Sequence, residues 1–113
     1  MGIETVQLSD YPPVARALGI EPKGLVVVDV EPGSAAALAG LQPYREGIRG
    51  NRRVPLSADV IIAMDGKEMN TAAEFGAAID RHTAGEVVNV TVIRGNQKIQ
   101  IPLKLQEAPH QTR

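Results

Sequence analysis

The clearest pattern of hydrophobic and polar positions lies near the C-terminus, where every second residue is apolar. The apolar positions are Val88, Val90 and Val92 in one run and Ile99, Ile101, Leu103 and Leu105 in the next. Alternation of this kind is typical of a strand with one buried face, and Gly95-Asn96 between the runs predicts a β-hairpin. Pro102 cannot donate a hydrogen bond to a strand ladder, which predicts an edge position or a bulge there.

Three earlier stretches also predict strands. Residues 25–30 and 60–64 are short runs rich in β-branched residues, as expected of buried strands. Residues 2–8 are apolar at Ile3, Val6 and Leu8, an imperfect alternation. Asp65-Gly66 follows the 60–64 run and predicts a tight turn.

Helices are predicted where capping residues precede apolar positions. Ser34 is placed to cap a short helix over residues 35–39, which Gly40 ends in the left-handed conformation. Pro12-Pro13 predicts the first turn of a helix that ends at Gly19. Thr71 and Glu74 have the spacing of a capping box, which predicts a helix from residue 72 to about residue 83.

Residues 42–57, QPYREGIRGNRRVPLS, interrupt this pattern. They hold two glycines and two prolines, and four arginines (Arg45, Arg49, Arg52 and Arg53) against the one acid Glu46. We interpret them as a solvated loop, because surface loops accept added length at little cost. The alternative is a loop that docks on another domain of a larger parent protein, on another subunit or on an acidic substrate.

Composition limits the possible functions. A chain of 113 residues is expected to form one domain, and its net charge of −1 gives no general attraction to nucleic acid or anionic membranes. No apolar run approaches the roughly 20 residues of a membrane span. The absence of cysteine excludes disulfides and thiolate zinc sites. Aromatic residues make up 3% of the chain, so platforms for stacking bases are not expected.

The sequence contains no recognisable catalytic or metal-binding set. Ser34 is explained as a helix cap, His82 as a residue near a helix C-terminus, and His110 lies in a polar tail. A nucleophilic triad needs a base that a third group orients, and no motif supports one. We therefore expect no catalytic residues, no metal and no cofactor.

The stretch from Gly24 to Leu41, GLVVVDVEPGSAAALAGL, resembles the V-x-x-V-x-P-G-S-x-A-x-x-A-G-L signature of bacterial-type PDZ domains. It is most similar to those that follow the protease domain in HtrA/Deg serine proteases. Residues 59–66 resemble the family's D-x-I-x-x-(V/I)-(D/N)-G strand and turn, and residues 86–105 its closing hairpin. Met1-Gly2-Ile3 stands where the family has its apolar-Gly-apolar carboxylate-binding loop. The resemblance covers roughly residues 1–106, and residues 107–113 form a polar tail.

The resemblance implies an α+β, mainly β fold: a partly open β-sandwich or barrel of five to six strands with two helices and one helical turn. It also implies recognition of hydrophobic C-terminal or extended peptide segments by β-strand addition. The carboxylate loop and free strand edge would be Met1, Gly2, Ile3, Glu4, Thr5 and Val6, and the helix side of the groove Ala72, Phe75, Gly76 and Ile79. Phe75 and Ile79 have the alternative of being plain core residues. Glycine is unfavourable inside a helix, so Gly76 suggests a close approach there.

The partners implied are C-terminal or unfolded polypeptide segments and the protease domain of a parent chain, in the periplasm or cell envelope. Met1 then stands at a cut in a longer chain, or at a natural start codon. One alternative is an assembly module that packs on a protease domain or subunit with little peptide binding. Another is a PDZ domain of a different parent, such as a site-2-type or carboxyl-terminal processing protease.

Overall fold

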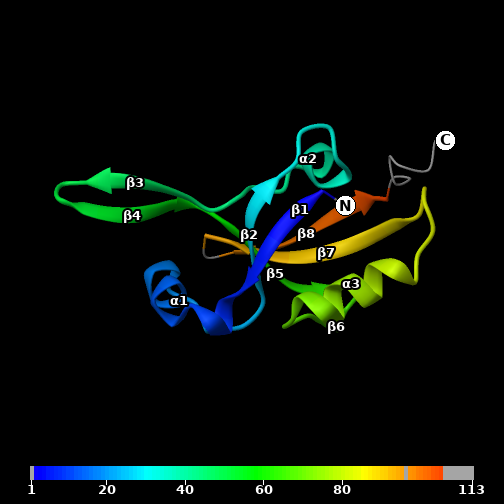
Figure 1. Cartoon of the computed structure of the whole chain (residues 1–113), viewed down its shortest axis with the longest axis horizontal. Coiled ribbons are helices and arrows are strands. Elements are labelled where there is room, and N and C mark those ends of the chain that lie inside the picture. Colours follow the sequence, from blue (N-terminus) through cyan, green and yellow to red (C-terminus); the bar gives the residue numbers. More distant parts are fainter. Residues whose placement is uncertain (1, 96, 106–113) are drawn as a thin grey trace.

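The computed structural model describes residues 2–95 and 97–105 and consists of strands with three α-helices packed around them (Figure 1). The elements in chain order are β1 (Ile3–Gln7), a 3-10 turn η1 (Leu8–Asp10), α1 (Pro12–Leu18), β2 (Leu25–Val30), α2 (Ala35–Ala39), β3 (Arg45–Arg49), β4 (Arg52–Ser57), β5 (Asp59–Met64), β6 (Lys67–Glu68), α3 (Ala72–Asp80), β7 (Val87–Arg94) and β8 (Gln97–Lys104). The mainly β class expected from the sequence is confirmed. Met1, Asn96 and the predicted tail at 107–113 lie outside the described residues.

The main sheet is antiparallel and has the strand order β1-β2-β5-β7-β8, with the short β6 paired to β5. β1 and β8 are therefore the two edges of this strand path. Pro102 lies in the edge strand β8, opposite Asn89 of β7, which agrees with the predicted edge position. β3 and β4 form a separate two-stranded sheet that projects away from the rest of the molecule (Figure 1).

Two hydrophobic clusters hold the sheet to its helices. The larger one joins buried residues of the sheet to Ala35 and Ala36 of α2 and to Phe75 and Ala78 of α3. The alternating C-terminal runs contribute Val88, Val90, Val92, Ile101, Leu103 and Leu105 to this cluster. The smaller cluster packs Ala15 of α1 against Leu8, Val26, Ala58 and Val60. The alternation predicted for β7 and β8 thus marks their buried face.

The helix ends follow the predicted capping chemistry. The hydroxyl of Ser34 accepts a hydrogen bond from Ala37 N–H at 3.2 Å, and α2 ends at Gly40, whose φ is 88°. Thr71 and Glu74 form the predicted capping box at the start of α3. α3 ends at Asp80, earlier than the predicted residue 83. The last turn closes at Arg81, and the Thr83 N–H instead donates to the carboxylate of Glu86.

Residues 42–57 are not a loop, and this part of the prediction is wrong. They form the β3–β4 hairpin, with Arg49 directly opposite Arg52 and the two-residue turn Gly50-Asn51 between them. Gly50 has a φ of 65°, which glycine adopts without strain. A Gly-Asn turn is a recognised hairpin signal. The side chains of β3 show no buried apolar alternation, so the signal was not recognised in the sequence.

The base of this hairpin is fixed to the main sheet. Asp59 is fully buried, and its carboxylate accepts hydrogen bonds from Gln42 N–H at 2.9 Å and from the Arg94 guanidinium at 2.7 and 2.8 Å. Tyr44 N–H donates to the Val27 carbonyl at 2.7 Å, and the Tyr44 hydroxyl donates to Glu46. Burial of the phenol, together with this hydrogen bond, raises the pKa of Tyr44 to about 12.

Among the described residues, no helix has both the length and the apolar character needed to cross a membrane.

Candidate functional site

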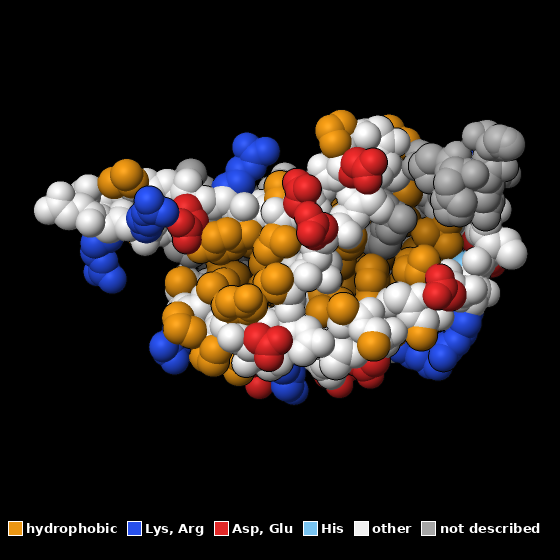
Figure 2. Space-filling model, viewed as in Figure 1, with side chains coloured by type: hydrophobic (Ala, Val, Ile, Leu, Met, Phe, Trp, Pro, Cys, Tyr) orange, Lys and Arg blue, Asp and Glu red, His pale blue; other side chains and the backbone are white. Residues whose placement is uncertain are grey.

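β1 is an open edge of the main sheet, and α3 lies beside it. β2 is the one strand that pairs with β1 among the described residues, so the other long side of β1 has no strand on it. α3 contacts β1, and Figure 2 shows hydrophobic side chains exposed in the space between these two elements. A strand edge beside a helix can accept the backbone of an extended peptide as a further strand.

Gly2 begins this edge in a conformation that other residues rarely adopt. Its φ is 84°, and its carbonyl accepts a hydrogen bond from Glu31 N–H at 2.7 Å. A Cβ on Gly2 would overlap the Cβ and Oγ of Ser34, the capping residue of α2. The predicted carboxylate-binding loop therefore rests on the start of α2, and glycine is required there for space as well as for its dihedral angles.

The predicted residues of β1 lie on different sides of the strand. Ile3 is half-buried against the larger cluster, which includes Phe75 and Ala78 of α3. Val6 packs instead against the smaller cluster beside α1. Glu4 is exposed and Thr5 half-buried, and a register irregularity lies between them. This irregularity explains why the alternation in residues 2–8 is imperfect.

The predicted helix residues divide between core and surface. Phe75 is 7% exposed and belongs to the larger cluster, so the core alternative describes its position. Ile79 is half-buried against that cluster, while Ala72 and Gly76 are exposed. A Cβ on Gly76 would meet no atom within 4 Å, so the close approach suggested by a glycine inside a helix is not present. Gly76 leaves open space on this side of α3.

A capping box fixes the start of α3. Thr71 Oγ1 accepts from Glu74 N–H at 3.0 Å, and Glu74 Oε1 accepts from Asn70 N–H at 2.9 Å and Thr71 N–H at 3.1 Å. These backbone donors favour the ionised carboxylate and lower the pKa of Glu74. The wall of the candidate site is therefore a helix with a fixed N-terminal end.

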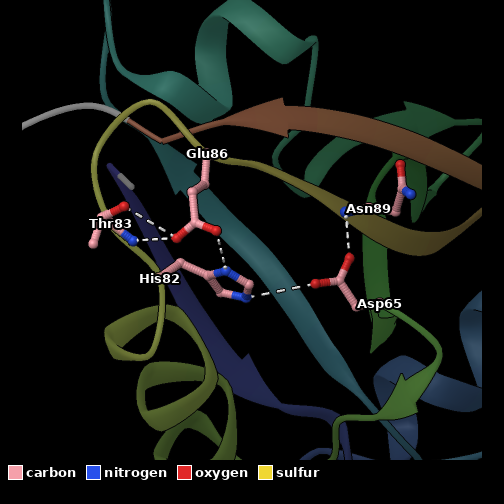
Figure 3. Close-up of polar contacts among 5 residues, drawn as sticks. All are labelled: Asp65, His82, Thr83, Glu86 and Asn89. Atoms are coloured by element: carbon pink, nitrogen blue, oxygen red, sulfur yellow. Dashed lines mark hydrogen bonds and ion pairs between the residues drawn. The ribbon is translucent and has the colours of Figure 1, made fainter.

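A second polar cluster fixes the other end of α3, and its contacts were not predicted from the sequence. His82 lies between the carboxylates of Asp65 and Glu86, with Nε2–Oδ2 and Nδ1–Oε2 distances of 3.5 Å (Figure 3). Asp65 also accepts from Asn89 N–H at 2.9 Å. Hydrogen bonds from Thr83, with the nearby His82, lower the pKa of Glu86. This cluster joins the end of α3 to the β5–β6 turn and to the start of β7.

The His82 cluster includes no hydroxyl nucleophile from the part of the chain that the structure describes. In the described ranges, no serine or threonine hydroxyl is hydrogen-bonded to the imidazole, and the Thr83 hydroxyl donates to Glu86. The same ranges hold no group of three or more His, Cys, Asp or Glu side chains placed to bind a metal. What the site offers chemically is an open backbone edge, a glycine-containing loop and apolar side chains.

Comparison with known proteins agrees with this geometry. The family model described as "PDZ domain" matches residues 1–105. Protease Do-like 8, chloroplastic, of Arabidopsis thaliana is 33% identical over 95 residues, which cover 84% of this chain and 20% of that protein. A probable periplasmic serine endoprotease DegP-like from Hahella chejuensis (strain KCTC 2396) is 26% identical over 89 residues, covering 79% and 16%. The chain thus spans a fifth or less of the length of these two relatives.

A solved structure shows the same fold. The crystal structure of the HtrA3 PDZ domain bound to a phage-derived ligand, FGRWV, superposes with a TM-score of 0.68 at 18% sequence identity. The match covers 92% of this chain and 81% of that one. The predicted resemblance to PDZ domains of HtrA/Deg proteases is confirmed: the chain belongs to the PDZ domain family.

Proposed function

We propose that this chain is the peptide-binding PDZ module of an HtrA-like serine protease. It captures hydrophobic C-terminal or extended peptide segments, which add to β1 as a further strand, and so regulates or feeds the protease. The observation that carries this proposal is the open edge of β1 beside α3, with Gly2 at positive φ where the edge begins. The peptide bound to the HtrA3 PDZ domain supports it by analogy.

The proposed roles follow from the placement of each group. Backbone N–H groups near Gly2 and Ile3 would receive the terminal carboxylate, and β1 from Glu4 to Val6 would pair with the peptide backbone. Ile3, Ile79 and the open space at Gly76 would receive the last side chain of the peptide. Ala72 and Phe75 complete the proposed helix side, with Phe75 supporting the groove from the core. Met1, also proposed for the loop, lies outside the described residues.

The chain itself is proposed to be non-catalytic, with the catalytic residues in the protease domain of the parent. Its location would be that of the parent: one relative is periplasmic and another chloroplastic by name, and we propose a periplasmic or cell-envelope parent. No cofactor or nucleic acid takes part in the proposed mechanism. Affinity for one short peptide on a small groove is expected to be about micromolar, near −8 kcal/mol.

The test is a screen of this chain against a library of peptides with free C-termini, followed by fluorescence anisotropy of the best binder. We expect a preference for apolar C-terminal residues and a large loss of binding when the terminal carboxylate is amidated. Binding that is indifferent to amidation would replace carboxylate capture with recognition of extended segments. No binding by any peptide would favour the assembly module as the alternative function.

The variant Gly76→Leu tests the position of the groove. Leucine favours the helix by about 1 kcal/mol over glycine and has free space in the unliganded chain, so thermal stability should be kept. Peptide affinity should fall about tenfold, or 1.4 kcal/mol, because the new side chain occupies the groove. Ala77→Leu, roughly 100° further round the helix, is the matched control and should bind normally. Equal peptide affinity in both variants would show that this side of α3 does not form part of the peptide site.

A further inference from the structure

The β3–β4 hairpin is a two-stranded sheet whose outer part, from Arg45 to Arg53, is almost entirely exposed. All β3 residues are exposed except Gly47, which is half-buried and has no side chain. Ile48, with 77% of its surface exposed, is among the most exposed large hydrophobic residues. Arg52 and Arg53 of β4 are exposed as well. An isolated two-stranded hairpin is marginally stable in water at best. This hairpin is anchored at its base through Tyr44 and Gln42, while its outer part presents an uncovered surface.

The charged residues of this hairpin are mostly positive. Four arginines against one acid give residues 42–57 a net charge of +3, so the rest of this chain of net charge −1 carries −4. Arg49 and Arg52 lie directly opposite each other, an unfavourable pairing of like charges. Arg53 is paired with Glu46 at 3.5 Å, whereas Arg45, Arg49 and Arg52 form no ion pair with the described residues. The hairpin therefore has arginines available for carboxylates from outside it.

The complementary surface is on the main sheet of the same chain. Glu4 of β1 lies directly opposite Asp29 of β2, and Glu31 follows two residues after Asp29. All three are exposed, and within the described ranges none is ion-paired. Asp59, Asp65 and Glu86, by contrast, already have basic partners. Figure 2 shows Lys and Arg side chains along the hairpin and Asp and Glu side chains over the middle of the same face.

We propose that two copies of this chain exchange their β3–β4 hairpins about a twofold axis. Each hairpin would lie on the partner's β1–β2 face, where its arginines meet the carboxylates of Glu4, Asp29 and Glu31. In such a symmetric dimer the contact between the hairpin arginines and the acidic β1–β2 face occurs twice, once in each direction, as is usual for dimers with a twofold axis. Arginine pairs well with carboxylates because its donors match both oxygens, and each pairing would relieve a like-charge contact in one of the strand pairs. Ile48 would lose its exposure to water in the same contact.

The first experiment is sedimentation velocity of the full 113-residue chain over a range of protein and salt concentrations. We expect a dimer at low ionic strength that dissociates at high ionic strength, because salt screens charges over about 10 Å. Arg49→Glu combined with Arg52→Glu should weaken the dimer at least tenfold, about 1.4 kcal/mol. Lys98→Glu combined with Lys104→Glu makes the same change in net charge on the far edge strand β8, and should leave the dimer intact.

A charge exchange then tests the two patches against each other. Asp29→Arg combined with Glu31→Arg should also weaken the dimer at least tenfold when alone, but a mixture of this variant and the hairpin variant should form a heterodimer with the wild-type affinity. Circular dichroism checks that both are folded, and if the acidic-face variant is not, Asp29→Lys alone replaces it. A wild-type chain that stays monomeric at low salt would overturn the proposal. So would a dimer insensitive to hairpin reversal, or a folded mixture that does not associate. Peptide affinity is measured separately, so failure here leaves the proposed function untouched.

Discussion

The two hairpins of this domain have similar turns and opposite surroundings. β3–β4 turns through Gly50 with a φ of 65°, and β7–β8 turns through Gly95 with a φ of 64°. In β7–β8 the alternating side chains of Val88, Val90, Val92, Ile101 and Leu103 are buried. In β3–β4 nearly every described side chain is exposed. Turn chemistry thus specifies that a hairpin forms, while apolar alternation specifies that it joins the core.

The two hairpins are connected through the buried carboxylate of Asp59. Arg94 ends β7, and its guanidinium binds the Asp59 carboxylate and the Gly40 carbonyl. Asp59 in turn holds Gln42 at the base of β3–β4. One buried carboxylate therefore ties the exposed hairpin to the packed one.

The largest expected loss of stability comes from removing the ion pair between Arg94 and Asp59. Arg94→Leu should lower the free energy of unfolding by about 3–5 kcal/mol, because it leaves the buried Asp59 carboxylate without its cationic partner. Urea denaturation measures the change. The matched control is Arg53→Leu, which removes an exposed ion pair with Glu46 and should cost no more than about 1 kcal/mol. Similar losses in both variants would show that the buried ion pair of Asp59 stabilises the fold no more than an exposed ion pair does.

The core position Leu103 should give the next largest effect. Leu103 is fully buried in β8, and Leu103→Ala should cost about 2–5 kcal/mol through lost burial and the cavity left behind. Thermal and urea unfolding measure it. A cost below about 1 kcal/mol would mean that β8 repacks, and that the packed hairpin is less fixed than its burial suggests.

A smaller, pH-dependent effect on stability is expected at Glu86, the residue just before β7. The pKa of Glu86 is lowered in the fold by its hydrogen bond from Thr83 and by His82, so its ionised form stabilises the folded state above the pKa of the unfolded chain. Glu86→Gln should therefore reduce the melting temperature at neutral pH. The difference from the wild type should shrink as the pH falls through the lowered pKa and the wild-type carboxylate is protonated.

Melting curves from neutral to acidic pH measure this difference. Glu21→Gln, at an exposed position between α1 and β2, removes one negative charge elsewhere on the surface and is the control. A difference between Glu86→Gln and wild type that persisted unchanged at acidic pH would assign the effect to the shape of the side chain rather than to its charge.

The smallest effect is expected in the exposed hairpin. Ile48→Ala should change the free energy of unfolding by less than about 0.5 kcal/mol when measured at high salt, where any dimer is dissociated. Chemical denaturation is the measurement. A loss comparable to that of Leu103→Ala would contradict the difference between the two hairpins, because it would show that Ile48 is buried in the monomer.

The sequence predicted those parts of the fold that local chemistry determines. Ser34, Gly40 and the Thr71–Glu74 box act through neighbours a few residues away, and each was confirmed. The hairpin at residues 42–57 was missed because its side chains from Arg45 to Arg53 are almost all exposed, which leaves no buried alternation to detect in β3. Phe75 could not be assigned to core or groove, because helical periodicity identifies an apolar face without identifying what covers it.

The candidate site shows the same limit. A free strand edge from Glu4 to Val6 was predicted, and β1 is an edge strand; Gly2 was predicted to need unusual dihedral angles, and its φ is positive. The support of Gly2 by Ser34 was not predicted, because these residues are distant in sequence and meet only in the folded chain. The contacts of His82 with Asp65 and Glu86 were missed for the same reason.

The open side of β1 also has a consequence for handling the protein. A strand edge that can receive a peptide can equally receive the same edge of another molecule, which is how sheet proteins begin to aggregate. β8 is protected by Pro102 and by the exposed Lys98 and Lys104, whereas β1 has the charge of Glu4 and a single register irregularity. Concentrated, unliganded stocks should therefore lose material to precipitation sooner than stocks saturated with a bound peptide.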